Sequence, residues 1–368
     1  MPVPLDEYPV HQTPLSMKYV GTSDRNFYDR CYFNAHDRTG EIFLITGAGV
    51  YPQLGVKDAY AVVRRGSDQH VIRVSDALDD ERLNLSVGPY RVEVIEPLQR
   101  VRLICDADSA GIGFDLTWTG SFPAIDEDHH ILRQGVRPII EASRFAQLGS
   151  WEGELRVAGE TIEVDPDVWV GSRDRSWGIR PIGDPEPAGK PFEGSEDWGL
   201  YWLYIPVRFD DYSIMVIVQE DGLGHRTLND AVRILPDGRV EQLGWPRVRI
   251  TYQSGTRIPE HARVELTERD GTPVLLEVDS LLGVPLHVGC GYGGDPDWTH
   301  GQWRGPDWLE GATYDFTDPE VAARTPWGVV DHVGRATCNG DLGWGLFEHG
   351  TIGKHLPSGF TDIGSVAP

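Results

Sequence analysis

Short runs in which hydrophobic and polar residues alternate recur along almost the whole chain, and turn-forming residues separate them. Glu41–Thr46, Tyr90–Ile95 and Arg263–Thr267 are examples of such runs. This pattern is typical of antiparallel β proteins with many strands. Ser213–Glu220 is apolar at both odd and even positions, which predicts a strand buried on both faces.

Helical periodicity is scarce in this sequence. Asp76–Leu83 is a short polar candidate, and Asp318–Ala323 could form one or two turns after a cap at Thr317. An α/β fold would need many more helices than these. We therefore predict an all-β protein.

One stretch interrupts the strand rhythm more than any other. Pro181–Glu196 is rich in proline, glycine and acidic residues, as linkers are. We predict a domain join there, which divides the chain into residues 1–185 and 186–368. Each half has room for a barrel of about eight strands of about ten residues. A second irregular stretch, Cys290–Gly311, is too long for a hairpin loop, and we expect it to act as a lid or as a plug between the barrels.

Composition narrows the partners and the compartment. The 368 residues are 40% hydrophobic and 24% charged, as in ordinary globular proteins, and the formal net charge is −24. That charge disfavours nucleic acid and anionic membranes. We expect a cytoplasmic protein with no membrane span, because the first residues lack the pattern of a signal peptide. The cysteines Cys31, Cys105, Cys290 and Cys338 lie far apart, and we expect free, buried thiols.

The most individual segment is Val168–Pro181, VWVGSRDRSWGIRP. It resembles a signature of the tandem lipocalin-like superfamily, which contains carotenoid 1,2-hydratases, AttH-like proteins, survival factors and intramolecular Diels–Alderases. The closing segment Gly340–Gly350 is similar to the end of the second barrel in these proteins. The matching residues of the first segment are Gly171, Arg173, Asp174, Arg175, Ser176, Trp177, Gly178 and Arg180.

The resemblance implies two lipocalin-like antiparallel β-barrels in tandem and a cavity for a hydrophobic small molecule. It implies no single reaction, because members include hydratases, cyclisation catalysts and carriers. Related carotenoid hydratases tend to carry histidine where this chain has Arg175. Arginine cannot release its proton at neutral pH, so Arg175 is expected to pair with a carboxylate or to orient an anionic ligand.

Asp174 is the carboxylate inside the motif, between Arg173 and Arg175. Two flanking cations should hold it ionised, which favours a structural clasp in which Trp177 closes the base of a barrel. The alternative is that Asp174 acts as an acid or base.

Strand alternation also suggests a polar and aromatic face in Phe27–Asp37, where Tyr28, Arg30, Tyr32, Asn34 and His36 point the same way. Outward exposure on a hairpin is the alternative. The candidate catalytic residues are Asp174, Asp115, Tyr32 and His36. The candidate substrate-binding residues are Tyr28, Trp118, Gln147, Trp151, Arg175, Trp177, Trp202 and Tyr204.

Histidine and cysteine spacing shows no zinc motif, and no nucleotide-binding or nucleophile-elbow motif is present. We expect no metal and no cofactor. The sequence thus predicts a cofactor-independent enzyme of the lyase, hydratase, isomerase or cyclase type that acts on a hydrophobic small molecule. A non-catalytic carrier of a lipid or hydrophobic metabolite is the alternative.

Overall fold

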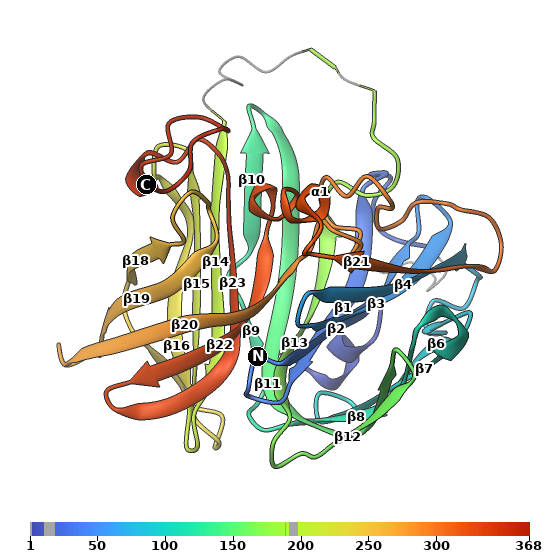
Figure 1. The fold of residues 1–368 in the computed structure, drawn as a ribbon, viewed down its shortest axis with the longest axis horizontal. Coiled ribbons are helices and arrows are strands. Elements are labelled where there is room, and N and C mark those ends of the chain that lie inside the picture. Colours follow the sequence, from blue (N-terminus) through green and yellow to red (C-terminus); the bar gives the residue numbers. More distant parts are fainter. Residues whose placement is uncertain (1, 11–18, 188, 191–197) are drawn as a thin grey trace.

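The computed structural model describes residues 2–10, 19–187, 189–190 and 198–368, and these residues form two antiparallel sheets. In Figure 1 the N-terminal sheet, blue to green, lies on the right, and the C-terminal sheet, yellow to red, lies on the left. Each sheet curls into a half-barrel. The prediction of an all-β fold with two curled antiparallel units is confirmed.

The strands of the N-terminal sheet are β1 Phe27–His36, β2 Ile42–Tyr51, β3 Val56–Arg65, β4 Asp68–Ala77, β5 Ser86–Val87, β6 Tyr90–Glu96, β7 Arg100–Ala107, β8 Ile112–Gly120, β9 Ile125–Asp126, β10 His130–Gln134, β11 Arg137–Val157, β12 Glu160–Val164, β13 Val170–Ile179 and β21 Trp308–Asp315. They pair in the order β21-β4-β3-β2-β1-β13-β11-β8-β7-β6-β5, with β9, β10 and β12 also paired to β11.

The strands of the C-terminal sheet are β14 Gly199–Arg208, β15 Ser213–Asp221, β16 Arg226–Ile234, β17 Val240–Gln242, β18 Arg247–Tyr252, β19 Pro259–Thr267, β20 Pro273–Pro285, β22 Val330–Cys338 and β23 Asp341–Gly353. They pair in the order β17-β16-β15-β14-β23-β22-β20-β19-β18. β15 is buried on both faces except at its last residue, as its apolar pattern predicts.

Helix is limited to short segments in the described part of the chain. α1 spans Pro319–Ala322, and its cap is Asp318, whose side chain accepts a hydrogen bond from the Glu320 backbone N–H. This agrees with the helix predicted at Asp318–Ala323, with the cap one residue later than expected. Asp76–Leu83 forms no helix, because it completes β4 and continues as irregular backbone. The 3₁₀ turns are Pro4–Glu7, Asp108–Ala110, Thr325–Trp327 and Leu356–Ser358.

One strand joins the two parts of the chain. β21 pairs antiparallel with β4 along its whole length, from Trp308 opposite Ser75 to Asp315 opposite Asp68. The edge of the N-terminal sheet is therefore covered by a strand from the later part of the sequence. The division at residues 185 and 186 stays a prediction, and β21 lies beyond it.

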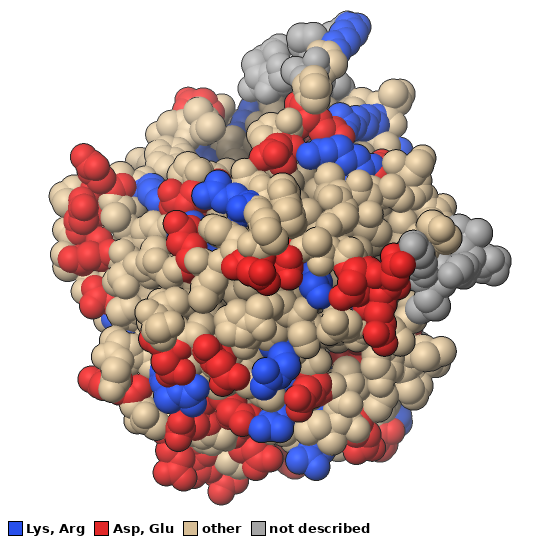
Figure 2. Space-filling model, turned by 90° about the vertical axis from the view of Figure 1, so that its right-hand side faces the viewer, with Lys and Arg blue, Asp and Glu red and all other residues tan. Residues whose placement is uncertain are grey.

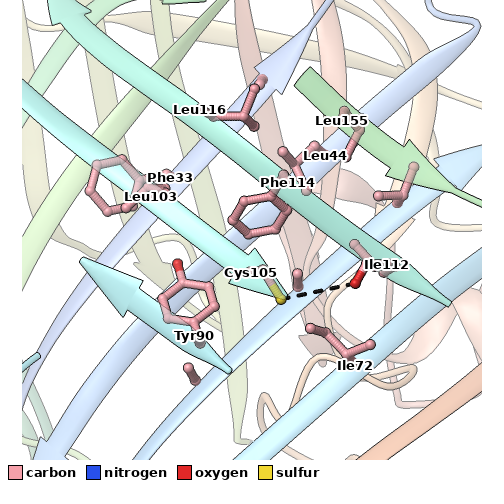
Figure 3. Packing of buried hydrophobic residues seen from close by; sticks show 14 of the residues in the cluster. Phe33, Leu44, Ile72, Tyr90, Leu103, Cys105, Ile112, Phe114, Leu116 and Leu155 are labelled. Atoms are coloured by element: carbon pink, nitrogen blue, oxygen red, sulfur yellow. Dashed lines mark hydrogen bonds between the residues drawn. The ribbon is translucent and has the colours of Figure 1, made fainter. Parts of the chain in front are cut away.

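Buried apolar side chains fill the interior of the N-terminal half-barrel. Figure 3 shows Phe33, Leu103, Phe114 and Leu155 among the side chains that point into this core from several strands. The Cys105 thiol donates to the Ile112 carbonyl at 4.0 Å, and all four cysteines are buried and free, as predicted. Burial of a side chain such as Phe114 contributes roughly 1.5–3 kcal/mol.

Strand β1 is buried on both faces, and this arrangement creates the space for a site. Its odd positions, such as Cys31 and Phe33, belong to the core of the N-terminal half-barrel, while Tyr32 packs in a second cluster with residues of the C-terminal sheet. The even positions therefore face the other sheet rather than solvent. The expectation that these residues share one face is confirmed, and outward exposure is excluded by their burial.

The signature strand β13 supplies two buried ion pairs to the inner face. Arg173 makes a bidentate pair with Glu7, at 2.7 and 2.9 Å, and Arg175 donates to Asp29 at 2.7 Å. Asp174 takes part in neither pair, because alternation turns it to the opposite face. The expected pairing of Asp174 with its sequence neighbours is therefore wrong, although a clasp of other residues exists.

The side of the molecule that Figure 2 shows carries both kinds of charge. On the face shown in Figure 2, acidic side chains are spread widely and basic ones lie between them. Such mixing limits repulsion within the chain while the net charge of −24 remains.

We predict that Glu7→Gln lowers the free energy of unfolding by about 3–5 kcal/mol, because it leaves the Arg173 charge buried without its counter-charge. Denaturant titration would measure this change. Glu152→Gln is the matched control, since Glu152 forms a half-exposed pair with Arg100 at 3.9 Å and should cost below about 1 kcal/mol. Equal effects of the two variants would contradict the clasp.

Candidate functional site

A cavity of about 250 Å³ lies between the two sheets. Its walls come from β1, β11 and β13 on one side, from β14, β15 and β23 on the other, and from the loop after β20. This volume is near the lower end of small-molecule sites, which measure about 300–1,000 Å³. A larger open groove of about 1330 Å³ lies along β16, β18, β19 and β20, and two of its three arginines, Arg226 and Arg263, are already paired with acids.

Two carboxyl groups from different sheets line the cavity, Asp174 on β13 and Glu348 on β23. Burial raises the pKa of Asp174 to about 6, against the opposing charge of Arg144. Burial also raises the pKa of Glu348 to about 7, and the neighbouring charge of Asp174 adds to this shift. The Trp202 indole donates to Glu348 Oε1 at 2.6 Å and fixes that carboxyl. Such a pair of carboxyls can exchange protons near neutral pH.

A third carboxyl lies behind the cavity wall. The Tyr32 hydroxyl donates to Asp331 Oδ2 at 2.5 Å, and Tyr32 stands opposite Asp174 in the pairing of β1 with β13. Burial raises the pKa of Asp331 well above its usual range, and the charge of Glu348 raises it further. Tyr32 therefore connects the cavity to a buried group that can hold a proton.

A largely buried arginine, Arg144, lies among the acidic groups. Arg144 donates to Glu127 at 2.5 Å and lies 4.4 Å from the ring centre of Tyr204, and His130 lies 3.3 Å from the same carboxylate. Although burial opposes it, Arg144 and His130 hold the pKa of Glu127 below its usual range. Glu127 is therefore an ionised counter-charge and not a proton donor.

Arg30 and Arg180 lie at the other end of the cavity. Their guanidinium groups flank the same two rings, with Arg30 4.6 Å and Arg180 5.7 Å from the centre of Tyr292, and each 5.6 Å from the centre of Tyr28. The Tyr292 hydroxyl also shares a 3.1 Å hydrogen bond with the Tyr60 hydroxyl. This end of the site combines positive charge with aromatic surface.

The structure brings together five of the residues that the sequence suggested. Asp174, Tyr32, Tyr28 and Trp202 line the cavity, and Tyr204 lies behind them against Arg144. The predicted plug at Cys290–Gly311 contributes Tyr292 to the wall, so this stretch takes part in closing the space between the sheets.

Three other candidate residues lie away from the cavity with clear physical roles. Asp115 is on the outer face of β8, where Arg102 donates to it at 2.7 and 2.6 Å and lowers its pKa. His36 is buried near Phe43, and burial lowers its pKa to about 3, so it stays neutral. Arg175 faces the inside of the N-terminal half-barrel.

The remaining candidates belong to that interior as well. Trp118 and Trp151 pack edge to face with ring centres 5.1 Å apart. The Gln147 amide accepts from Arg173 at 2.9 Å, and Trp177 is half-buried beside Phe145. Alternation explains all of these positions, because a side chain one residue away from a cavity residue points to the opposite face.

Sequence reasoning missed Glu348, Asp331 and Arg144 as site residues. Glu348 carried a local signal, since it is an acid between buried Phe347 and His349 in a glycine-rich strand. Arg144 carried no signal that separates it from surface arginines, because its burial depends on the second sheet.

Among the described residues, no helix is long and apolar enough to cross a membrane. Within the same ranges, no group of three or more His, Cys, Asp or Glu side chains is placed to hold a metal ion.

Two curled antiparallel sheets with a cavity between them form a fold of the tandem lipocalin-like type. Residues 3–361 match the model of a family of unknown function (DUF8625), so the chain belongs to this family. The comparison with curated protein sequences found no match.

Twelve chains of solved structures match the fold. A putative AttH protein from Nitrosomonas europaea has a TM-score of 0.53 at 12% identity, over 93% of this chain and 98% of that one. Kievitone hydratase from Nectria haematococca has a TM-score of 0.50 at 14% identity, over 87% of this chain and 88% of that one. At such low identity these similarities establish the fold, and they confirm the predicted lipocalin-like resemblance.

We predict that Asp174→Asn stabilises the protein at pH 8 and has little effect near pH 3. The pKa of Asp174 in the folded state, about 6, lies above its value in the unfolded state. The unfolded state therefore loses this proton at a lower pH, and the wild-type protein loses stability as pH rises from about 4 to 7. Removing the charge should raise the free energy of unfolding by up to about 3 kcal/mol at pH 8, as measured by denaturant titration.

Asp108→Asn is the control for this experiment. Asp108 accepts from Arg156 at 2.7 Å on the surface, and this hydrogen bond lowers its pKa, so the variant should lose a little stability at pH 8. A destabilised Asp174→Asn at pH 8 would show that Asp174 is a paired structural anion.

Proposed function

We propose that this protein is a cofactor-independent enzyme that adds water to, or otherwise moves protons on, a hydrophobic small molecule held between its two sheets. The observation that carries the proposal is the pair of cavity carboxyls, Asp174 and Glu348, with pKa values raised to about 6 and about 7. Groups that titrate near the working pH are suited to general acid and base catalysis. The domain division at 185 and 186 and the cytoplasmic location remain part of this proposal.

The two carboxyls can divide the roles of acid and base. Burial raises the pKa of both groups, so either can hold a proton near neutral pH, and we take Glu348 as the acid and Asp174 as the base. In a hydration, the Glu348 proton goes to one carbon of a double bond and leaves a cation at the other carbon. Water adds to that cation, and its extra proton passes to Asp174, so the product is an alcohol. The reverse sequence is a dehydration.

Aromatic side chains support the charged intermediate in this scheme. Tyr28 and Trp202 line the cavity, and their ring faces attract a cation. Tyr32, bonded to Asp331, offers a route by which a proton returns between turnovers. The name of one fold neighbour, kievitone hydratase, agrees with water addition as the reaction class.

The proposed function can be tested with isotopically labelled water. Native mass spectrometry of the purified protein would first identify any bound small molecule, and a panel of prenylated phenols and terpenoid alkenes would then be incubated with the protein in H₂¹⁸O and in D₂O. We expect incorporation of one labelled oxygen, or of deuterium at carbon, by the wild-type protein. Asp174→Asn and Glu348→Gln should each lower the rate about 10²- to 10⁴-fold while the compound still binds.

Asp108→Asn provides the matched control, because it removes a carboxylate on the surface and should leave the rate unchanged. A bound compound that exchanges no label with the wild-type protein would favour the carrier function instead. Full activity in both cavity variants would refute the acid and base roles.

A further inference from the structure

Arg30 is a buried cation without an anionic partner among the described residues. Its exposed fraction is 4%, and its guanidinium lies 5.6 Å from the ring centre of Tyr28 and 4.6 Å from that of Tyr292. No described carboxylate lies within 4 Å of it, and no described oxygen accepts its hydrogen bonds. A buried charge left in this state is costly unless something else pairs with it.

The other buried arginines show how this protein treats such groups elsewhere. Six arginines are buried among the described residues, and all except Arg30 have oxygen acceptors. The acceptors are Tyr314 for Arg73, the Pro9 carbonyl for Arg82, Glu7 for Arg173, Asp29 for Arg175, and backbone carbonyls such as that of Gly353 for Arg257. Arg30 also differs from these five because it alone lines the cavity between the sheets.

Arg180 strengthens the case from a neighbouring position. It lines the same cavity, flanks the same two tyrosine rings, and has no described carboxylate within 4 Å. Asp174 is close enough for its charge to be felt but lies beyond ion-pair distance. Two guanidinium groups thus lie beside the same two tyrosine rings of the cavity, while Asp174, Glu348 and other polar side chains such as Gln219 line the rest of it.

We propose that Arg30 and Arg180 bind a carboxylate on the substrate, so that the substrate class is a hydrophobic carboxylic acid. The planar fork of arginine matches the two oxygens of a carboxylate. A dianion such as a phosphate fits less well, because ionised Asp174 would repel it more strongly. The inference rests on the proposed function, since it names the substrate class of the same site.

This anchor would also orient the substrate. With its carboxylate held at the Tyr28 and Tyr292 end, the apolar part of the molecule extends toward Trp202, where Glu348 is fixed. The reacting bond then lies between the acid on one sheet and the base on the other. Holding the reacting groups in the correct orientation lowers the activation free energy substantially.

The experiment compares two probes of equal size, trans-cinnamate and cinnamamide, by isothermal titration calorimetry on the full chain. We expect the wild-type protein to bind the carboxylate about 10- to 100-fold more tightly than the amide. Arg30→Met and Arg180→Met should each reduce this ratio toward one. Arg64→Met is the matched control, because Arg64 also lies over a ring, 3.8 Å from the centre of Phe316, but outside the cavity.

Stability distinguishes a binding role of Arg30 from a structural one. Arg30→Met should raise the denaturant midpoint or leave it unchanged, because it removes an unpaired buried charge, and Arg30→Lys should keep part of the preference for cinnamate. A lower midpoint with an unchanged ratio would overturn the proposal. Equal affinity of the wild-type protein for both probes would also overturn it. So would a wild-type protein that binds 4-nitrophenolate through Arg30 but does not bind cinnamate.

These results separate the inference from the proposed function. The calorimetric measurement of cinnamate binding needs no turnover, so it tests the carboxylate site even if the protein exchanges no label with any compound. Conversely, label exchange that depends on Asp174 and Glu348 would support the proposed function even if the protein showed no preference for cinnamate over cinnamamide.

Discussion

The burial of both faces of the central strands is the constraint on which the rest of this structure depends. β1 and β13 each contribute one face to the core of the N-terminal half-barrel and the other to the junction with the C-terminal sheet. Since side chains alternate along a strand, every step of one residue moves a group between two different environments. A polar residue on either face must therefore find a partner, change its protonation or face a cavity.

The charged residues of the signature segment show these outcomes side by side. Arg173 and Arg175 face the inner core and are neutralised by Glu7 and Asp29. Asp174, between them in sequence, faces the cavity, and burial raises its pKa instead. The same segment thus supplies ion pairs to the inside of the half-barrel and a carboxyl with a raised pKa to the cavity. The structural role and the proposed catalytic role therefore fall on different residues.

The cavity is an assembly of groups from distant parts of the chain. The charge of Asp174 on one sheet raises the pKa of Glu348 on the opposite sheet. The Tyr32 hydroxyl donates to Asp331, which lies 299 positions away in the sequence. The loop after β20 adds Tyr292, which packs under Arg30. Relatives with this architecture can change chemistry by changing the lining while the two sheets stay in place, and this agrees with a fold shared at only 12–14% identity.

The sequence by itself determined the strands, the all-β class and the helix near Asp318, because alternation, turn residues and caps act over a few neighbouring positions. The two curled units followed from the resemblance of Val168–Pro181 to a known superfamily. The sequence also marked Asp174, Tyr28, Tyr32 and Trp202 through the signature and the alternation of β1. It could not place Glu348 and Arg144 opposite them, nor the pairing of β21 with β4. It suggested that neighbouring arginines hold Asp174 ionised, whereas burial raises the pKa of this group to about 6. Those features depend on which faces meet when the sheets pack. Desolvation, which sets the protonation of buried carboxyls, exists only once that packing has formed.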